Sequence, residues 1–192
     1  MPIVPDDKNW TWVLERACPD CGFDAKSFDP LMARAAIEAN AVRWRELLAD
    51  PRATQRPVEN TWSATEYACH VRDVYRLYLL RLERMLYEDD PTFANWDQDA
   101  TAIEDAYNER QPNDVAGELH AAAGMLSARY ATVTGERWLR TGNRSDGVAF
   151  TIDSFTRYFV HDPVHHVWDA EQGYRKLGGG TAWAPPTGAP VT

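Results

Sequence analysis

The sequence predicts an all-α protein, a four-helix bundle with one long crossover connection. Apolar residues recur at helical spacing in four long stretches, and capping residues or prolines precede them. The 192 residues have room for one domain with a substantial core. We expect an N-terminal extension over residues 1–28, the bundle over residues 29–175, and a flexible tail rich in Gly and Pro over residues 176–192.

The first two helices have clear start signals. The first follows Asp29-Pro30, a capping residue and a proline at the first helical position, and runs to about residue 49. The second begins after Ser63, which stands three residues before Glu66 in the spacing of a capping box, and it ends before an Asp-Asp-Pro stop near residue 91. These signals predict two long helices separated by a polar connection.

The second half of the chain predicts two further long helices. A polar and aromatic connection contains a short helix at residues 101–109, and the third long helix follows over residues 113–135. Residues 141–147 are rich in Gly, Asn, Asp and Ser and predict a turn. The fourth helix is expected over residues 151–173, and only residues 147–151 resemble a strand.

Composition excludes several classes of function. The formal net charge of −9 and the lack of a basic stripe argue against nucleic-acid binding. The chain has neither the pattern of a signal peptide at its start nor a run of about 18 apolar residues that could span a bilayer. We therefore expect a cytoplasmic protein without a nucleic-acid or membrane partner.

A histidine cluster on the fourth predicted helix is the strongest functional signal. Three of the five histidines, His161, His165 and His166, lie within six residues. At about 100° per residue, His161 and His165 lie about 40° apart on one helix face, whereas His166 points elsewhere. His70 shares the inward face of the second helix, so His70, His161 and His165 are the predicted metal ligands.

Two alternatives accompany this prediction. A single inward histidine is more often a neutral imidazole held by a hydrogen bond, but three such residues together favour a metal. Pro163 either kinks a continuous helix, which we favour, or restarts it with Asp162 as the cap, which would let His166 replace a ligand. Asp162 and Asp169 are candidate acceptors for the distal N–H groups of the ligands, or solvated acids of the helix face.

The cysteines offer half of a second site. Cys18-Pro-Asp-Cys21-Gly22 has the turn chemistry of a zinc knuckle, but zinc needs four ligands. Cys69, His120 or a second copy of the chain would have to complete it. A reduced pair or a local disulfide is the favoured interpretation, with zinc binding and a redox role as alternatives.

These residues carry a family resemblance. The segment Trp62-Ser-Ala-Thr-Glu-Tyr-Ala-Cys-His70, together with His161-x-x-x-His165, resembles the DinB-like superfamily of metal-binding four-helix bundles over residues 29–175. The resemblance implies that His70, His161 and His165 bind a divalent metal, zinc or nickel, in an open site. Members of this family include S-transferases that use mycothiol, bacillithiol or glutathione, and the mycothiol-dependent maleylpyruvate isomerase.

The expected function follows from an open metal position. Three protein ligands leave room for a thiol or a water, and a metal activates either one as a nucleophile. We expect a metal-dependent thiol S-transferase or isomerase acting on a small molecule, with a hydrolase as the runner-up. Arg72, Arg144 and Arg157 are candidate anchors for an anion, although such arginines are usually solvated. A non-catalytic structural or interaction protein is the alternative, and a homodimer is compatible with each of these functions.

Overall fold

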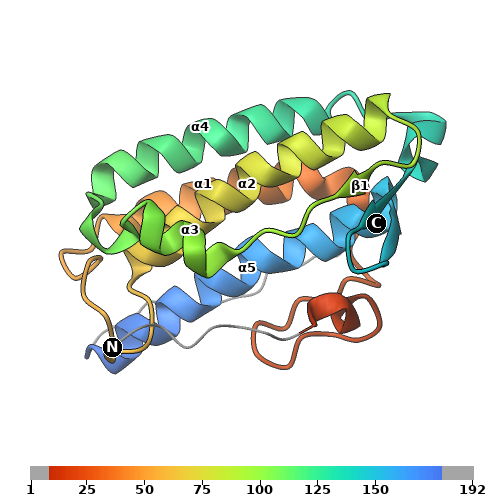
Figure 1. Ribbon diagram of the computed structural model, residues 1–192. Helices are drawn as coiled ribbons and strands as arrows, with labels where there is room; N and C mark the ends of the chain where they lie inside the picture. Colours follow the sequence, from red (N-terminus) through yellow and green to blue (C-terminus); the bar gives the residue numbers. More distant parts are fainter. Residues whose placement is uncertain (1–8, 179–192) are drawn as a thin grey trace.

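The computed structural model describes residues 9–178, and Figure 1 shows their arrangement. Residues 1–8 of the predicted extension and residues 179–192 of the predicted tail lie outside the described part. Four long helices dominate the molecule: α1 (Ala33–Leu48), α2 (Ala64–Tyr87), α4 (Pro112–Tyr130) and α5 (Ile152–Lys176). The predicted four-helix bundle is confirmed.

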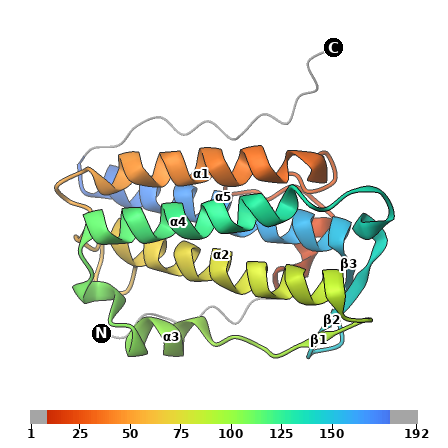
Figure 2. The same ribbon diagram turned by 90° about the horizontal axis from the view of Figure 1, so that it is seen from above.

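The helices enclose one apolar core. Both α1 and α2 pack against α4 and against α5, so the order around the bundle is α1, α4, α2, α5, as the view in Figure 2 shows. Large side chains fill the space between them, among them the fully buried Trp44, Tyr75, Leu119 and Phe159. Burial of this apolar surface is the main stabilising contribution to such a bundle.

The predicted start of α2 is confirmed in atomic detail. The Ser63 hydroxyl accepts from the Glu66 N–H at 3.3 Å, and the Glu66 carboxylate accepts from the Ser63 N–H at 2.8 Å. This capping box satisfies two N–H groups that the first turn leaves without helical partners. The box fixes the first turn of α2, and His70 follows one turn later.

Helix α5 runs without a break through Pro163, as the favoured interpretation predicted. The Pro163 carbonyl accepts a hydrogen bond from Asn40 Nδ2 of α1 at 2.8 Å, and Asn40 Oδ1 accepts one from the Tyr75 hydroxyl of α2 at 2.6 Å. Three helices are therefore tied together at the proline. The continuity of α5 keeps residues 161, 162, 165 and 166 in helical register.

Short elements close one end of the bundle and cover one side. Strand β1 (Thr92–Phe93) pairs in parallel with β2 (Thr141–Arg144), which pairs antiparallel with β3 (Ala149–Thr151). The turn predicted at residues 141–147 is thus partly a strand, because pairing with a distant segment decides this structure. The short helix predicted at residues 101–109 is divided into α3 (Gln98–Glu104) and a 3₁₀ turn, Tyr107–Glu109.

The N-terminal segment lies along α5 (Figure 1). A 3₁₀ helix, Trp10–Leu14, places the Trp10 ring 5.4 Å from the His161 ring and 5.2 Å from the His165 ring, measured between centroids. A second 3₁₀ turn, Pro30–Met32, leads into α1 and is capped by the Asp29 side chain. The segment therefore brings its cysteines to the histidine-bearing part of α5.

None of the helices within residues 9–178 is long and apolar enough to cross a membrane.

Candidate metal centre

The first group of candidate ligands joins two helices. His70 of α2 meets Asp162 and His166 of α5, and one ligand atom from each lies within 4.8 Å of the others. The distance from Asp162 Oδ1 to His70 Nε2 is 3.5 Å, and that to His166 Nε2 is 3.9 Å. Asp162 and His166 are four residues apart, so they lie on one face of α5.

Polar atoms of His70 and Asp162 are buried without hydrogen-bond partners among residues 9–178. His70 is 1% exposed, and neither of its ring nitrogens has a hydrogen-bond partner within the described chain. The same holds for Asp162 Oδ1, which is buried as well. A buried polar atom without a hydrogen bond lowers the free energy of unfolding by about 1–3 kcal/mol. Here two such atoms, His70 Nε2 and Asp162 Oδ1, lie 3.5 Å apart. Two imidazoles and a carboxylate are the donor set of a divalent ion, so these residues fit one.

Asp169 of α5 orients the histidines. Its Oδ2 lies 2.9 Å from His166 Nδ1 and 3.7 Å from His165 Nε2. A carboxylate on one ring nitrogen fixes the tautomer and leaves the opposite nitrogen to bind a metal. Asp169 therefore lies beside ring nitrogens of two histidines, as one of the two interpretations of the sequence expected, whereas Asp162 belongs to the group of candidate ligands itself.

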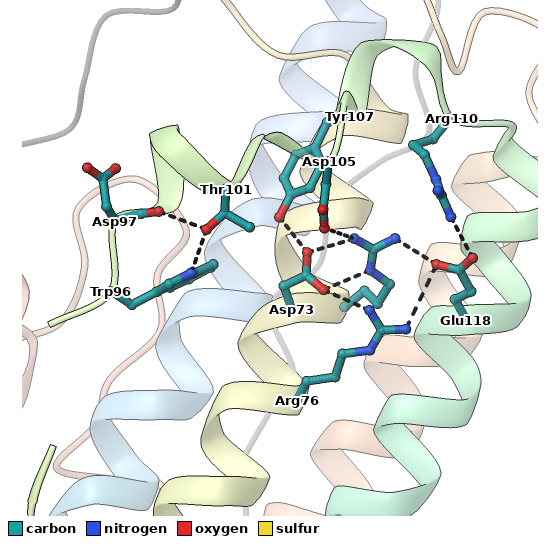
Figure 3. A network of polar contacts seen from close by, with 10 residues as sticks. Asp73, Arg76, Trp96, Asp97, Thr101, Asp105, Tyr107, Arg110 and Glu118 are labelled. Atoms are coloured by element: carbon teal, nitrogen blue, oxygen red, sulfur yellow. Dashed lines mark hydrogen bonds and ion pairs between the residues drawn. The ribbon is translucent and has the colours of Figure 1, made fainter. Parts of the chain in front are cut away.

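Aromatic rings enclose His70. Trp96 stacks on it with 5.4 Å between centroids and 16° between planes, and Trp62 lies 5.6 Å away. The Trp96 indole N–H donates to Thr101 Oγ1 at 2.8 Å, which holds the ring in place (Figure 3). This packing fixes the imidazole and keeps water from its apolar side.

A network of charged groups lies beside this aromatic shell. Arg72 contacts Asp73 and Glu118 at 2.6–2.7 Å, Asp73 accepts from the Tyr107 hydroxyl at 2.5 Å, and Arg110 binds Glu118, as Figure 3 shows. The network joins α2 to α4 and to the connection between them. The Arg72 guanidinium is buried among these acids and does not line the cavity described below, so it is not an anchor for a substrate.

A second group gathers Cys18, Cys21, His161 and His165. All four residues are buried, and one ligand atom from each lies within 4.8 Å of the others. Cys18 Sγ is 3.6 Å from His165 Nδ1, and the cysteines are not joined in a disulfide. The cysteine pair thus meets the two histidines of α5, and not Cys69 or His120.

The predicted ligand set is divided between these two groups. His161 and His165 lie together as expected, but among the described residues no group within 4.8 Å combines either of them with His70. The partners of His70 are Asp162 and His166, which the sequence interpretation placed in supporting or outside roles. The physical reason is the rotation of α5: residues 162 and 166, one position further along the helix, face α2. Metal binding at each group stays a prediction.

Burial and neighbouring charges set the protonation of these residues. Burial lowers the pKa of His161 to about 3, with a further contribution from His165, and burial also lowers the pKa of His165. Burial would raise the pKa of Asp162, but His70 and His166 outweigh it and hold this pKa well below the usual value. A neutral imidazole and an ionised carboxylate are each the form that binds a metal ion.

A cavity of about 640 Å³ opens beside both groups. Asp162, His166, His161 and His165 line it, together with residues of the N-terminal segment and of the connections that follow α2 and β2. Two cations also line it. Arg81 has a buried Nε without a hydrogen-bond partner in the described chain, and Arg144 donates to the Tyr158 hydroxyl at 3.1 Å. The volume is that of a site for a small organic molecule.

Of the arginines considered as anion anchors, only Arg144 reaches the cavity. Arg157 instead donates to the carbonyls of Ala25 and Phe28 and pairs with Asp153, so it holds the N-terminal segment on α5. Arg81 was missed from the sequence, although its position, seven residues after Val74, lies on the inward face of α2. Its burial depends on the connection at Ala94, whose carbonyl accepts from Arg81 at 3.0 Å.

Comparisons with known proteins agree with this architecture. The family model of the DinB superfamily matches residues 24–170. No curated protein matches the chain. A solved structure that resembles it is YfiT from Bacillus subtilis, described as a probable metal-dependent hydrolase with an unusual four-helix bundle topology. The TM-score is 0.64 at 17% identity, over 92% of this chain and 94% of YfiT, and this likeness concerns the fold. Because the family model spans most of the chain and the bundle agrees with it, the chain belongs to the DinB superfamily.

Proposed function

We propose that this protein is a metal-dependent enzyme whose divalent ion is held by His70, Asp162 and His166. The observation that carries the proposal is the convergence of buried atoms without hydrogen-bond partners, His70 Nε2 and Asp162 Oδ1, beside His166 at a cavity wall. Zinc and nickel are the ions we expect, because both accept imidazole and carboxylate ligands.

The ligand set favours an anionic nucleophile. Two neutral imidazoles and one carboxylate leave a divalent ion with a net charge of about +1, and the ion supplies Lewis acidity that lowers the pKa of a bound thiol or water. Asp169 holds the His166 ring, and Trp96 holds the His70 ring, so both imidazoles are oriented in advance. Ligand side chains that are already in place lose less conformational entropy when the metal ion binds.

The cavity supports a small anionic substrate. Arg81 and Arg144 lie on its wall, and the Tyr158 hydroxyl bound to Arg144 adds a further polar group. Arg144 is paired with the carboxylate of Asp146. Arg81 instead donates to a backbone carbonyl, that of Ala94, so this contact gives Arg81 no counter-charge. A carboxylate on the substrate would supply this counter-charge to Arg81.

Transfer of a mycothiol-type thiol, or isomerisation with that thiol as cofactor, is the reaction we favour. The cavity volume of about 640 Å³ exceeds what water and one small electrophile need, and it accommodates part of a low-molecular-weight thiol as well. Hydrolysis is the second candidate. It is favoured by the likeness in fold to YfiT, which is described as a probable metal-dependent hydrolase.

Metal content and cobalt spectroscopy test this proposal. We expect His70→Ala and Asp162→Asn to lose about one metal ion per chain relative to wild type, whereas the exposed control Asp114→Asn loses none. Adding mycothiol to the cobalt-loaded wild type should strengthen the thiolate-to-cobalt charge-transfer band, and His70→Ala should abolish this increment. Unchanged metal content in both variants would contradict the site. A band unaffected by mycothiol, with metal-dependent cleavage of p-nitrophenyl acetate, would favour hydrolysis.

A further inference from the structure

The cluster of Cys18, Cys21, His161 and His165 takes no part in the proposed reaction. It brings two sulfurs and two imidazole nitrogens within 4.8 Å of one another, on four buried residues. Two thiolates and two imidazoles are an established ligand set of structural zinc. We propose that these residues form a second metal site, a closed tetrahedral zinc centre that fastens the N-terminal segment to α5.

The distance between Cys18 and His165 agrees with tetrahedral zinc. Bond lengths of about 2.3 Å for Zn–S and about 2.05 Å for Zn–N, at a tetrahedral angle, place a sulfur and a nitrogen ligand about 3.6 Å apart. Cys18 Sγ and His165 Nδ1 are 3.6 Å apart. A hydrogen bond from the Cys18 thiol to the imidazole would also be compatible with this distance, but it involves only two of the four residues, whereas one zinc ion would bind all four.

The cysteine-bearing turn has the conformation that a zinc knuckle needs. Gly22 has φ of 75°, a left-handed value that a side chain would strain. The Gly22 N–H donates to the Cys18 carbonyl at 3.0 Å, and the Cys18 N–H donates to the Phe23 carbonyl at 2.8 Å. These bonds close the turn and present both thiols to α5.

One ring nitrogen of each histidine lies within 4.8 Å of both sulfurs. His161 and His165 stand one turn apart on α5, and the buried His161 Nε2 has no hydrogen-bond partner in residues 9–178. His165 faces Cys18 through Nδ1, while its Nε2 is 3.7 Å from Asp169. An imidazole with a carboxylate at the distal nitrogen is the arrangement typical of zinc-bound histidine.

The two groups then have different roles. The cysteine–histidine cluster offers four protein ligands, which close a zinc coordination sphere, whereas His70, Asp162 and His166 offer three and leave a position open. Asn9 and Trp10 of the fastened segment line the cavity. Zinc in the cluster would therefore hold one wall of the proposed reaction site without contacting the substrate.

Metal analysis of the full-length protein tests the second site. Wild type purified without a metal-affinity column should contain about two ions per chain, and Cys21→Ser should contain about one. Cys69→Ser is the matched control, since Cys69 is also a buried free cysteine but lies outside both groups, and it should keep both ions. His70→Ala should lose only the other ion, so the failure of one site is distinguishable from the failure of the other.

A measurement on wild type covers the case in which Cys21→Ser does not fold. Cobalt-reconstituted wild type should show a thiolate-to-cobalt charge-transfer band without any added thiol, together with the visible bands of tetrahedral cobalt. Absence of this band would overturn the proposal. So would a Cys18–Cys21 disulfide in protein purified under reducing conditions, or a Cys21→Ser variant with wild-type metal content.

Discussion

Asp169 is the residue at which the two histidine groups meet. One of its carboxylate oxygens lies 2.9 Å from His166 Nδ1 and 3.7 Å from His165 Nε2. A single acid thereby hydrogen-bonds a ring of one group and lies within ion-pair distance of a ring of the other. This arrangement links the geometry of the proposed reaction site to that of the proposed zinc site, although the ligands differ.

We expect Asp169→Asn to weaken metal binding without unfolding the protein. An amide in place of this carboxylate makes each imidazole less basic and less well oriented, and changes of this kind lower metal affinity by about 10–100-fold. Competition titration with a chromogenic chelator measures the effect. Asp114→Asn is the control, because Asp114 is exposed on α4. Equal affinities for wild type and Asp169→Asn would contradict this role.

Residue by residue, the sequence identified the right helices but not the grouping. The i, i+4 spacing of His161 and His165 was visible, yet Asp162 and His166 have the same spacing one residue later. Only the rotation of α5 against α2 decides which pair faces His70. For the cysteine turn, a reduced pair or local disulfide was favoured and zinc binding was an alternative. That His161 and His165 lie beside the turn depends on where the N-terminal segment packs.

Among the elements, α5 contributes two residues to each group, and Pro163 lies inside it between these residues. A proline inside a helix removes an N–H donor and crowds the preceding turn, which weakens the helix locally. Asn40 supports the helix here by donating to the Pro163 carbonyl and accepting from Tyr75. The buried amide therefore fixes the part of α5 that carries the candidate ligands.

Asn40→Ala should destabilise the protein by about 1–3 kcal/mol, because the Tyr75 hydroxyl and the Pro163 carbonyl would lose their partner in the core. Tyr75→Phe should cost less, since it removes a single hydrogen bond. Urea denaturation followed by circular dichroism gives both values. Asn113→Ala, at an exposed position, is the control. A free energy of unfolding in Asn40→Ala equal to that of wild type would show that this bridge is not needed.

The capping signals and the long apolar periodicities predicted the helices well because both are local. Of the small sheet, only β3 was expected, within residues 147–151. Strands as short as Thr92–Phe93 are stabilised by partners about fifty residues away along the chain, not by their own sequence. Gly142 illustrates the dependence on tertiary structure: a Cβ added there would come within 2.8 Å of the Phe93 ring. Close approach of two segments is not visible in either one alone.

For the whole molecule, the core contains phenols that resist ionisation. Burial is the largest cause that raises the pKa of seven tyrosines: Tyr67, Tyr75, Tyr78, Tyr107, Tyr130, Tyr158 and Tyr174. In the unfolded chain these phenols ionise near pH 10. Above that pH the unfolded state binds fewer protons than the folded state, so stability falls as the pH rises.

We therefore expect alkaline unfolding to be steep and cooperative. Each buried phenol contributes a loss of up to about 1.4 kcal/mol per pH unit between its unfolded and folded pKa values. Tyrosinate absorbance and helical circular dichroism, recorded on one sample through an alkaline titration, should change together above pH 10. Ionisation of most tyrosines while the helical signal stays intact would contradict the burial that the structure assigns to them.

The central claim is that a divalent ion binds between His70, Asp162 and His166. The most direct measurement is an anomalous difference map, collected at the zinc absorption edge from crystals of the full-length protein grown with zinc. We predict one peak bounded by His70, Asp162 and His166, and a separate peak bounded by Cys18, Cys21, His161 and His165. A peak shared by His70, His161 and His165, or the absence of density beside His70, would contradict the proposed metal site.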